Sequence, residues 1–514
     1  MSSPRTADSI FGPRHRARDR GRGQKMSVVG WRRIEVIMLL AAVLGLDGAD
    51  KCTIGAIATS LESALHIGNT EIGLLVTAST GVGALATLPL GILVDRINRK
   101  RLLTGAIVVW SIAMVVSAFA HSFSWLLLSR LGLGAIVATA FPAVASLAGD
   151  MFPSFERGRI WGYLLAGELL GTAFGFLVSG LLAGAVDWRA PFWALGLIGF
   201  TLAGLVAWRL PEPMRGGHAL LPPYRHDRQQ AHADDDREAL AKEIEAFDIP
   251  ARKDRVLTEN PANMPLRKAL AYVLTIRTNV ALIVASALGY FYFTGIRTFA
   301  VVFMSGRFGL SESVASLTTV GLGLGSILGV LVTGQLADRL IARDKITARI
   351  VVGGLAFLVT AAVLLPALMS QMLWVAAPML FLSAVALGGS NPPLDAARLD
   401  IIPSRLWGRA ESIRTTLRYA FEAVAPLAFG YFSSLFGGGG GAYGPTSDTI
   451  EQGAQGLDDA FLLLLILPAL AGVILLLAHS SYPRDTATAL ASERALADSE
   501  NEARNRRESR TTSG

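Results

Sequence analysis

Long apolar segments alternate with short polar ones along most of this chain of 514 residues. A helix of about 20 apolar residues suffices to cross the hydrocarbon core of a bilayer, and twelve runs reach or approach that length. We expect them at 34–56, 71–94, 102–120, 124–148, 159–184, 189–209, 279–304, 313–335, 347–368, 372–396, 407–434 and 458–480. A soluble protein of this size would show shorter apolar runs and periodic polar faces. The pattern therefore predicts an all-α polytopic membrane protein with twelve transmembrane helices.

Internal similarity indicates that these runs form two related halves. Six residues between 142 and 159 recur at an offset of 250. They are Pro142, Asp150, Pro153, Ser154, Gly158 and Arg159, which return as Pro392, Asp400, Pro403, Ser404, Gly408 and Arg409. Such duplications are a feature of secondary transporters. We therefore expect two pseudo-symmetric six-helix halves, over residues 34–209 and 279–480.

The basic residues indicate which connections share a side of the membrane. The chain has 47 Lys and Arg and 40 Asp and Glu, and nearly all of the Lys and Arg fall in alternate connections. Those connections are 1–33, 95–101, 149–158, 210–278, 336–346, 397–406 and the segment after 480. The opposite connections hold only Arg189 and Arg307, and the long one at 435–457 holds no basic residue. The positive-inside rule then predicts a protein of the inner (plasma) membrane with both termini cytoplasmic.

Three segments lie outside the two halves. Residues 1–33 are basic and precede the first span, so we expect them to contact anionic lipid head groups rather than nucleic acid. The central cytoplasmic loop, 210–278, ends in a stretch at 264–272 that is typical of an amphipathic interfacial helix. Residues 481–514 are charged and rich in Ala and Ser, which predicts disorder. We expect the protein to be a monomer.

The connection after the second run carries a recognisable motif. It reads Gly-x-Leu-x-Asp-Arg-x-x-Arg-Lys and includes Gly91, Asp95, Arg96 and Arg99; its weaker copy, 243 residues on, includes Gly334, Asp338 and Arg339. The motif resembles the signature loop of the major facilitator superfamily, and the twelve runs extend that similarity over nearly the whole chain. The resemblance implies the major facilitator fold. It also implies that these seven residues act as a conformational switch at the cytoplasmic face.

Ionisable residues inside the apolar runs point to function, because each is costly in a membrane unless it is paired or hydrated. The first run holds Asp47, Asp50 and Lys51, the fourth holds Arg130 at a similar depth, and the fifth holds Glu168. If Lys51 pairs with Asp50, Arg130 needs a partner of its own. We predict that the proton-coupling groups are among Asp47, Asp50, Arg130 and Glu168. The alternative is a buried ion pair that only locks helices together.

The first run resembles the corresponding run of two subfamilies. Asp47-Gly48-Ala49-Asp50 is similar to the Asp-Gly-x-Asp of aromatic-acid:proton symporters. Asp50-Lys51, with Asn98-Arg99-Lys100 further on, is similar to the Asp-Arg and Asn-Arg-Lys of Spinster-like lipid transporters. The Spinster pattern has a glutamate seven residues after the fourth-run arginine, where this chain has Val137. Both subfamilies stay open at this point.

Glycines recur at every fourth position in the fifth and eighth runs. They are Gly167, Gly171 and Gly175 in the fifth run and Gly321, Gly325 and Gly329 in the eighth. A stripe of this kind lets two helix backbones approach closely, so we expect close helix packing along both.

Charged residues share one face of the eleventh run. Glu411, Arg414, Arg418 and Glu422 follow one another at intervals of three or four, so their side chains point to the same side of a helix. The predicted substrate-binding residues are Arg414, Arg418, Glu422, Arg297, Tyr290 and Phe291. The offset of 250 makes Arg418 the counterpart of Glu168, which predicts a pair across the central cavity. The alternative is that Arg418 pairs with Glu422 or Glu411 in its own half.

These observations predict a secondary active transporter that works by alternating access. Proton coupling is expected, with uniport as an alternative, and the predicted substrate is a small organic acid or an amphipathic organic solute. Lysolipid transport and multidrug-type efflux are alternatives. A non-transporting membrane sensor would need a large output domain, for which 210–278 is too short. The chain has one cysteine, Cys52, and no nucleotide-binding loop or metal-ligand spacing, so we expect no enzyme activity, metal or cofactor.

Overall fold

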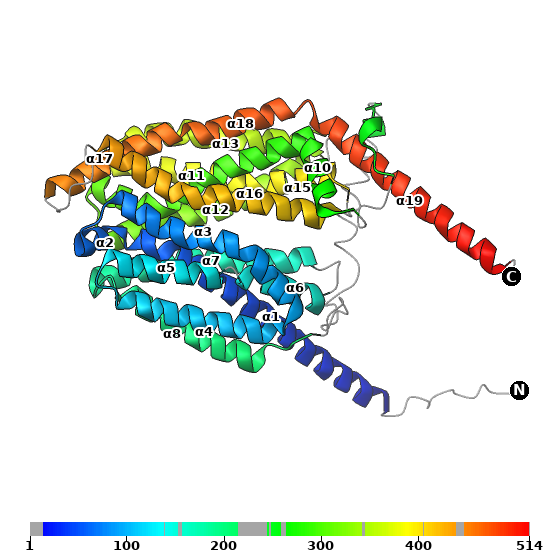
Figure 1. Ribbon diagram of the computed structural model, residues 1–514, viewed down its shortest axis with the longest axis horizontal. Helices are drawn as coiled ribbons and strands as arrows, with labels where there is room; N and C mark the ends of the chain where they lie inside the picture. The colour runs from blue at the N-terminus through cyan, green and yellow to red at the C-terminus, as the bar shows by residue number, and fades with distance from the viewer. Residues whose placement is uncertain are drawn as a thin grey trace, which may run out of the picture.

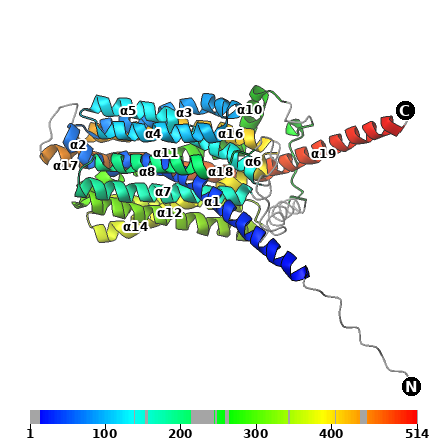
Figure 2. The ribbon, with the colours of Figure 1, turned by 90° about the horizontal axis from the view of Figure 1, so that it is seen from below.

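The computed structural model describes residues 14–137, 139–152, 157–213, 244–245, 248–258, 264–341, 345–403, 406–437 and 447–512. Over these ranges the chain is helical, with no strand. The helices lie nearly parallel to one another in a bundle of two halves (Figure 1). Both termini leave the bundle at the same end, and Figure 2 shows the first and last helices extending beyond that end.

The first half contains eight helices. They are α1 (Arg14–Ala56), α2 (Ala58–Leu65), α3 (Asn69–Arg96), α4 (Arg99–Ala118), α5 (Phe123–Val137), α6 (Ala140–Met151), α7 (Arg157–Ala185) and α8 (Ala190–Arg209). The short helix α2 lies at the end of the bundle remote from the termini (Figure 1).

Within the described residues, the second half contains eight more helices, and two short elements of the central loop precede them. The loop elements are η2 (Lys253–Arg255) and α10 (Leu266–Thr275). The helices of the half are α11 (Arg277–Phe308), α12 (Glu312–Ile341), α13 (Ala348–Met369), α14 (Leu373–Gly389), α15 (Asn391–Ile401), α16 (Trp407–Phe436), α17 (Ser447–Leu464) and α18 (Ile466–Ala478). The chain ends in α19 (Tyr482–Thr512).

The fold is the predicted one, an all-α polytopic bundle. Nine helical segments in the described part of the chain are long and apolar enough to cross a membrane. The fourth, tenth and twelfth predicted spans each consist of two consecutive helices. A proline follows each break by a few residues; the three are Pro142, Pro392 and Pro468. Proline has no backbone N–H, so each one removes the helical hydrogen bond to a carbonyl four residues earlier, at the break. Pro142 and Pro392 are repeat counterparts, so the duplication preserves this break.

Small residues bring α1 and α7 into close contact. A Cβ atom added at Gly167 would lie 2.7 Å from the Ala41 Cβ, and one added at Gly171 would overlap the backbone of Gly45. In α12 a Cβ atom at Gly329 would overlap the Val385 backbone of α14. The predicted close packing is therefore present along the α7 stripe and at Gly325 and Gly329 of α12, whereas a Cβ atom at Gly321 would meet no atom within 4 Å. Dispersion contacts over these flat surfaces replace the hydrophobic driving force that is missing between helices in lipid.

We expect Gly171→Val to destabilise the protein, because the added side chain forces the α1 and α7 backbones apart. Overpacking of this kind costs about 2 kcal/mol. The matched control is Gly162→Val in the same helix, where an added Cβ meets no atom within 4 Å. Thermal unfolding of the purified proteins in detergent measures the effect. An equal loss of stability in the two variants would show that helix propensity, not packing, is responsible.

The last helix, α19, differs from the disorder expected for residues 481–514. Its first turns are buried against the central loop: Thr486, Ala487 and Ala489 are each at most 4% exposed. The Arg252 N–H donates to the Thr488 hydroxyl at 3.0 Å, and the Leu257 N–H donates to the Ser492 hydroxyl at 3.1 Å. The Ala, Ser and Thr that suggested a tail of low hydrophobicity are here the small side chains that let this helix pack closely.

The two halves meet closely at the end remote from the termini. The Asn69 amide of α3 donates to the Ser433 hydroxyl of α16 at 2.9 Å, and Thr70 and Ser434 share a hydrogen bond of 2.8 Å. Ser313 at the start of α12 donates to the Gly180 carbonyl of α7 at 3.0 Å. These contacts join segments far apart in the sequence and close this end of the bundle.

Candidate functional site

The charged residues of the first span are all paired, but not as expected from sequence. Lys51 lies 2.5 Å from a carboxylate oxygen of Asp47 and 3.1 Å from one of Glu168 in α7. Asp50 instead pairs with Arg130 of α5 at 2.9 Å. Neighbouring residues of a helix point in different directions, whereas residues four apart share a face. Lys51 therefore pairs with Asp47 rather than with Asp50.

The Asp50–Arg130 pair is deeply buried in the first half. The side chains are 7% and 2% exposed, and the Arg130 guanidinium also lies 4.9 Å from the centre of the Phe192 ring. The Arg130 Nε atom has no hydrogen-bond partner. A buried charge left without its partner costs several kcal/mol, so loss of either charge must be compensated by a proton, water or movement.

The predicted pair between Glu168 and Arg418 is absent from this conformation. Glu168 pairs with Lys51 of its own half. Arg418 lies 3.3 Å from a carboxylate oxygen of Glu422, and its guanidinium stacks on the Tyr290 ring at 4.3 Å. The alternative, in which each charge is paired within its half, is what the structure has. Repeat symmetry makes the two residues counterparts but does not determine which partner each side chain contacts.

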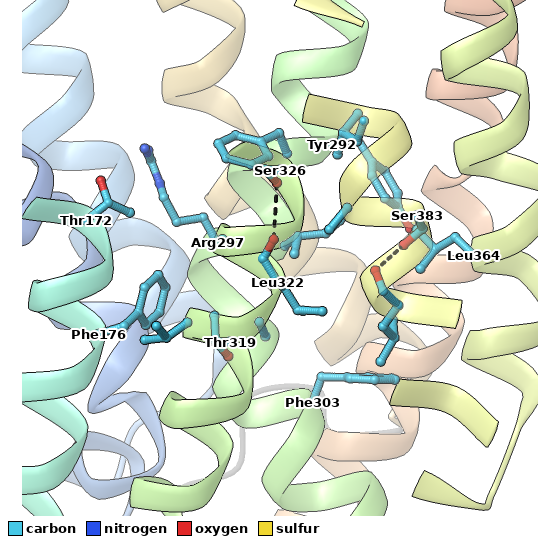
Figure 3. A pocket seen from close by; sticks show the side chains of 18 of the residues that line it. Thr172, Phe176, Tyr292, Arg297, Phe303, Thr319, Leu322, Ser326, Leu364 and Ser383 are labelled. Atoms are coloured by element: carbon cyan, nitrogen blue, oxygen red, sulfur yellow. Dashed lines mark hydrogen bonds between the residues drawn. The ribbon is translucent and has the colours of Figure 1, made fainter. Parts of the chain in front are cut away.

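A large apolar cavity lies beside these charges and extends into the second half (Figure 3). It is open to its surroundings, and the space between its walls, open solvent included, is about 1050 Å³. Its walls come from α7, α11, α12, α13 and α14, with Phe461 of α17. Gly323 of α12 lies on the wall, and an added Cβ there would meet no atom within 4 Å. The lack of a side chain at this position leaves room in the cavity.

Arg297 is the one charged residue among the described residues that line the cavity. Its side chain extends from α11 on the side of Thr172 in Figure 3. The Arg297 Nε atom is buried and has no hydrogen-bond partner. Arg297 also acts electrostatically on Glu168 and Lys51. The cavity therefore has one cationic end next to the charged cluster, while the rest of its wall is apolar.

The hydroxyl groups on the cavity wall donate their hydrogen bonds to the backbone. Five Thr and Ser hydroxyls donate to a carbonyl three or four residues earlier in their own helix, and the Tyr292 hydroxyl donates to the Phe461 carbonyl. The five pairs are Thr172–Glu168, Thr319–Ala315, Ser326–Leu322, Thr360–Ala356 and Ser383–Leu380. Figure 3 shows the Ser326 and Ser383 bonds. The wall thus offers few free donors to a polar ligand.

Sequence reasoning found one of the cavity residues and missed its walls. Arg297 was among the predicted substrate-binding residues and lines the cavity. The other five are not among the lining residues. They are Tyr290, Phe291, Arg414, Arg418 and Glu422. The signal that could have found the wall is the set of Thr and Ser hydroxyls within the apolar, Gly- and Ala-containing stretches of α12, α13 and α14.

In the first half, the predicted switch residue with a described side chain is Arg99. Arg99 is 1% exposed and pairs with Asp150 of α6 and, at 3.1 Å, with Glu212 after α8. The second half repeats this arrangement, because Arg349 lies 2.5 Å from Asp400, which also accepts a hydrogen bond from the Tyr482 hydroxyl. The two Arg–Asp pairs are related by the offset of 250. Each fixes the chain that leaves the sixth span of its half.

Other predicted residues lie outside the described side chains or differ in environment. The structure does not describe the surroundings of five of them, which are Gly91, Asp95, Arg96, Asp338 and Glu411. Arg339 is exposed. A Cβ atom added at Gly334 would lie 3.6 Å from the Pro392 Cβ, an ordinary contact. Among the described residues there is no cluster of side chains suited to hold a metal ion.

Comparison with known families decides the identity of the fold. The sequence profile described as Major Facilitator Superfamily matches residues 39–445. The chain belongs to the major facilitator superfamily. Members of this superfamily are membrane transporters, not enzymes.

Relatives within the superfamily have diverse cargoes. The chain is 29% identical over 164 residues to a probable sugar efflux transporter of Helicobacter pylori (strain G27), covering 32% of this chain and 42% of the relative. It is 27% identical over 168 residues to a probable L-galactonate transporter of Escherichia coli (strain K12), covering 33% and 37%. The chain thus spans about two-fifths of the curated relatives it matches.

Solved structures share the fold over almost the whole chain. A bacterial homologue of the human lysosomal transporter Spinster, inward-facing and occupied, superposes with a TM-score of 0.70 at 20% identity. The match covers 88% of this chain and 98% of that one. A D-xylose–proton symporter gives a TM-score of 0.60 at 16% identity, covering 86% and 96%. At these identities the similarity establishes the major facilitator fold alone.

Proposed function

We propose that this chain is a proton-coupled secondary transporter of an amphipathic organic anion. The observation that carries the proposal is the apolar cavity with Arg297 as its charged lining residue. An apolar body fills such a wall favourably, at about 25 cal/mol per Å² of apolar surface removed from water. The anionic group would accept hydrogen bonds from the guanidinium, whose planar fork suits carboxylate and phosphate.

The neighbouring charges support an anionic rather than a cationic group. Lys51 is shared by Asp47 and Glu168, so these three residues together carry a formal charge of −1. Arg297 supplies +1 on the facing half, and its Nε atom lacks a partner. A substrate anion would compete with Glu168 for Arg297. Binding would then alter the attraction between the halves, which is what a transporter needs for coupling substrate to movement.

Proton coupling is assigned to the first half. Asp50 is the partner of Arg130, and protonation of Asp50 would release a buried cation. Such a charge cannot stay unpaired in a membrane at small cost. The two protonation states therefore favour different arrangements of α1 and α5. We therefore prefer proton coupling to the alternative, in which the buried pair only locks α1 and α5 together.

Polyhydroxylated substrates fit the cavity poorly. A sugar carries several hydroxyl groups, and each one buried without a partner costs about 1–3 kcal/mol. The Thr and Ser hydroxyls of the wall already donate to the backbone. We therefore favour an apolar body over the sugars and sugar acids that the matched relatives carry. Lysolipids, which pair an acyl chain with a phosphate, belong to the favoured class.

The experiment that tests this function is uptake into vesicles reconstituted with the purified protein. The panel comprises a medium-chain carboxylate, an aromatic carboxylate, a monoacyl phospholipid, a neutral alcohol of equal chain length, and a sugar acid. The proposal requires uptake of at least one of the first three above the neutral alcohol and the sugar acid. Preferential uptake of the sugar acid would reject the apolar body, and preference for the alcohol would reject the anion.

We further propose the topology that the basic residues predict, in an inner membrane with both termini cytoplasmic and the basic N-terminal segment on anionic lipid. A reporter fused after Gly514 should then be active only in the cytoplasm. A peptide tag inserted in 435–457 should react with an antibody added to intact spheroplasts. The reverse pattern would overturn the orientation without affecting the fold.

A further inference from the structure

A hydrogen-bonded contact joins the two halves at the end remote from the termini. The Ser60 N–H, near the start of α2, donates to Glu312 Oε1 at 3.3 Å, and the Ser60 hydroxyl donates to Glu312 Oε2. The N-cap residue of α2, Ile57, provides no side-chain cap. Glu312, the first residue of α12, therefore caps a helix of the opposite half. Because donor and acceptor belong to different halves, this contact exists only while this end is closed.

Two further carboxylates lie around this contact. Glu62 follows Ser60 on α2, and Glu71 on α3 accepts a hydrogen bond from the Gly68 N–H at 3.0 Å. Burial, and then the nearby charges of Glu312 and Glu71, raise the pKa of Glu62 to about 8. Both halves thus contribute carboxylates to one small region, and the closed arrangement brings them together.

No cation offsets these carboxylates in the part of the chain that the structure describes. His66 lies in the turn after α2, and Arg307, on the adjacent helix α11, is engaged with Asp458. Glu62, Glu71 and Glu312 form no ion pair with any described residue. When the end opens, α2 and α3 separate from α12, and water replaces Glu312 as a neighbour of Glu62.

We propose that Glu62, Glu71 and Glu312, with Ser60, form a proton-sensitive latch that holds this end of the transporter closed when it carries a proton. The closed state gathers three carboxylates from two halves, and one bound proton removes most of the repulsion. The proton returns to the same side when the end opens. The latch therefore senses the pH of the compartment that it faces and adds nothing to the transport stoichiometry.

The sign of the pH dependence follows from linkage. The pKa of Glu62 is raised to about 8 in the closed state, and an open, hydrated state would restore its ordinary value of 4.5. Stabilisation of the closed state is then complete below the ordinary pKa and is lost as pH rises through about 8. Between about pH 6 and about pH 8 the ratio of closed to open molecules should fall about 50-fold.

Thiol labelling tests the latch without any substrate. Ser433 is fully buried at this end, so in a Cys52→Ala background Ser433→Cys reports opening through its reaction with a membrane-impermeant maleimide. Labelling of this protein is compared with that of the same protein carrying Glu62→Gln, which mimics permanent protonation. Dividing the labelling rate of one protein by that of the other at each pH cancels the effect of thiol ionisation on the rate, because both proteins carry the same introduced thiol.

The latch predicts that labelling of the Glu62→Gln protein is about 30-fold slower than that of the parent near pH 6 and slower by a further factor of about 50 near pH 8, because the open state of the parent loses its proton well below pH 6. Glu245→Gln, at an exposed carboxylate of the opposite end, should behave as the parent at both pH values. Ser60→Ala should speed labelling at both, because it weakens the contact without removing the proton site. A rate ratio of parent to Glu62→Gln that does not change with pH would overturn the proposal. The anion transport proposed above plays no part in this outcome.

Discussion

Arg297→Gln should weaken binding of an anionic substrate by about 10- to 100-fold, the value of a charge-assisted hydrogen bond to a buried anion. The guanidinium is the charged group on the wall of the cavity, and its buried Nε atom has no hydrogen-bond partner. Glutamine keeps hydrogen-bond donors of similar reach but removes the charge. Arg297→Lys should give an intermediate loss, because Lys keeps the charge but lacks the planar fork.

Equilibrium binding to the purified protein separates this role from a structural one. Each variant is titrated with a carboxylate ligand and with its neutral alcohol of equal length. Loss confined to the carboxylate assigns Arg297 to the anionic group. An equal loss for both ligands would show that Arg297 only shapes the cavity. Arg189→Gln, at a partly exposed arginine paired with Asp187, serves as the matched control and should leave both affinities unchanged.

Asp50→Asn should abolish accumulation driven by a proton gradient while leaving substrate exchange partly intact. The Asp50 carboxylate is the partner of Arg130 at 2.9 Å, and both side chains are nearly fully buried. The amide cannot take up and release a proton, so the alternation between a paired and an unpaired Arg130 is lost. The same change leaves Arg130 buried without a counter-charge, which should destabilise the protein by about 3–5 kcal/mol.

A second variant separates the loss of coupling from the loss of stability. Combining Asp50→Asn with Arg130→Gln removes both charges and should recover much of the stability, as measured by thermal unfolding. Coupling should stay absent, because no titratable group remains at the position. Asp187→Asn, at an exposed carboxylate, should behave as the parent in both assays. Gradient-driven accumulation by Asp50→Asn would remove Asp50 from the coupling mechanism.

Sequence reasoning succeeded where a one-dimensional pattern is sufficient. Apolar run length predicted the membrane helices, and the glycine stripe of Gly167, Gly171 and Gly175 predicted the close contact of α7 with its neighbour. The same pattern reasoning predicted disorder after 480, where the structure has α19. Short polar side chains such as Ser492 suggest a solvated tail in isolation, but they pack and bond once a partner surface is present.

The pairing of charges and the shape of the cavity could not be read from spacing. Spacing places Asp47 and Lys51 on one helix face, but the choice of Glu168 as the second partner of Lys51 depends on how α7 is rotated against α1. The cavity likewise depends on where five helices diverge. Sequence identified Arg297 as a charge in the membrane, and only the assembled walls show that it lies at one side of an apolar space.

The most direct measurement of the central claim is substrate accumulation in vesicles under an imposed pH gradient. Vesicles containing the parent protein are loaded at one pH and diluted into another, with a labelled medium-chain carboxylate outside. An empty vesicle and the Arg297→Gln protein give the background for passive entry. The account predicts that the parent accumulates the carboxylate above the passive, gradient-driven entry of both backgrounds, and that this excess collapses with a protonophore. Equal entry into empty vesicles and into vesicles with either protein would contradict the account. Uptake by the parent protein that does not depend on the pH gradient would also contradict it.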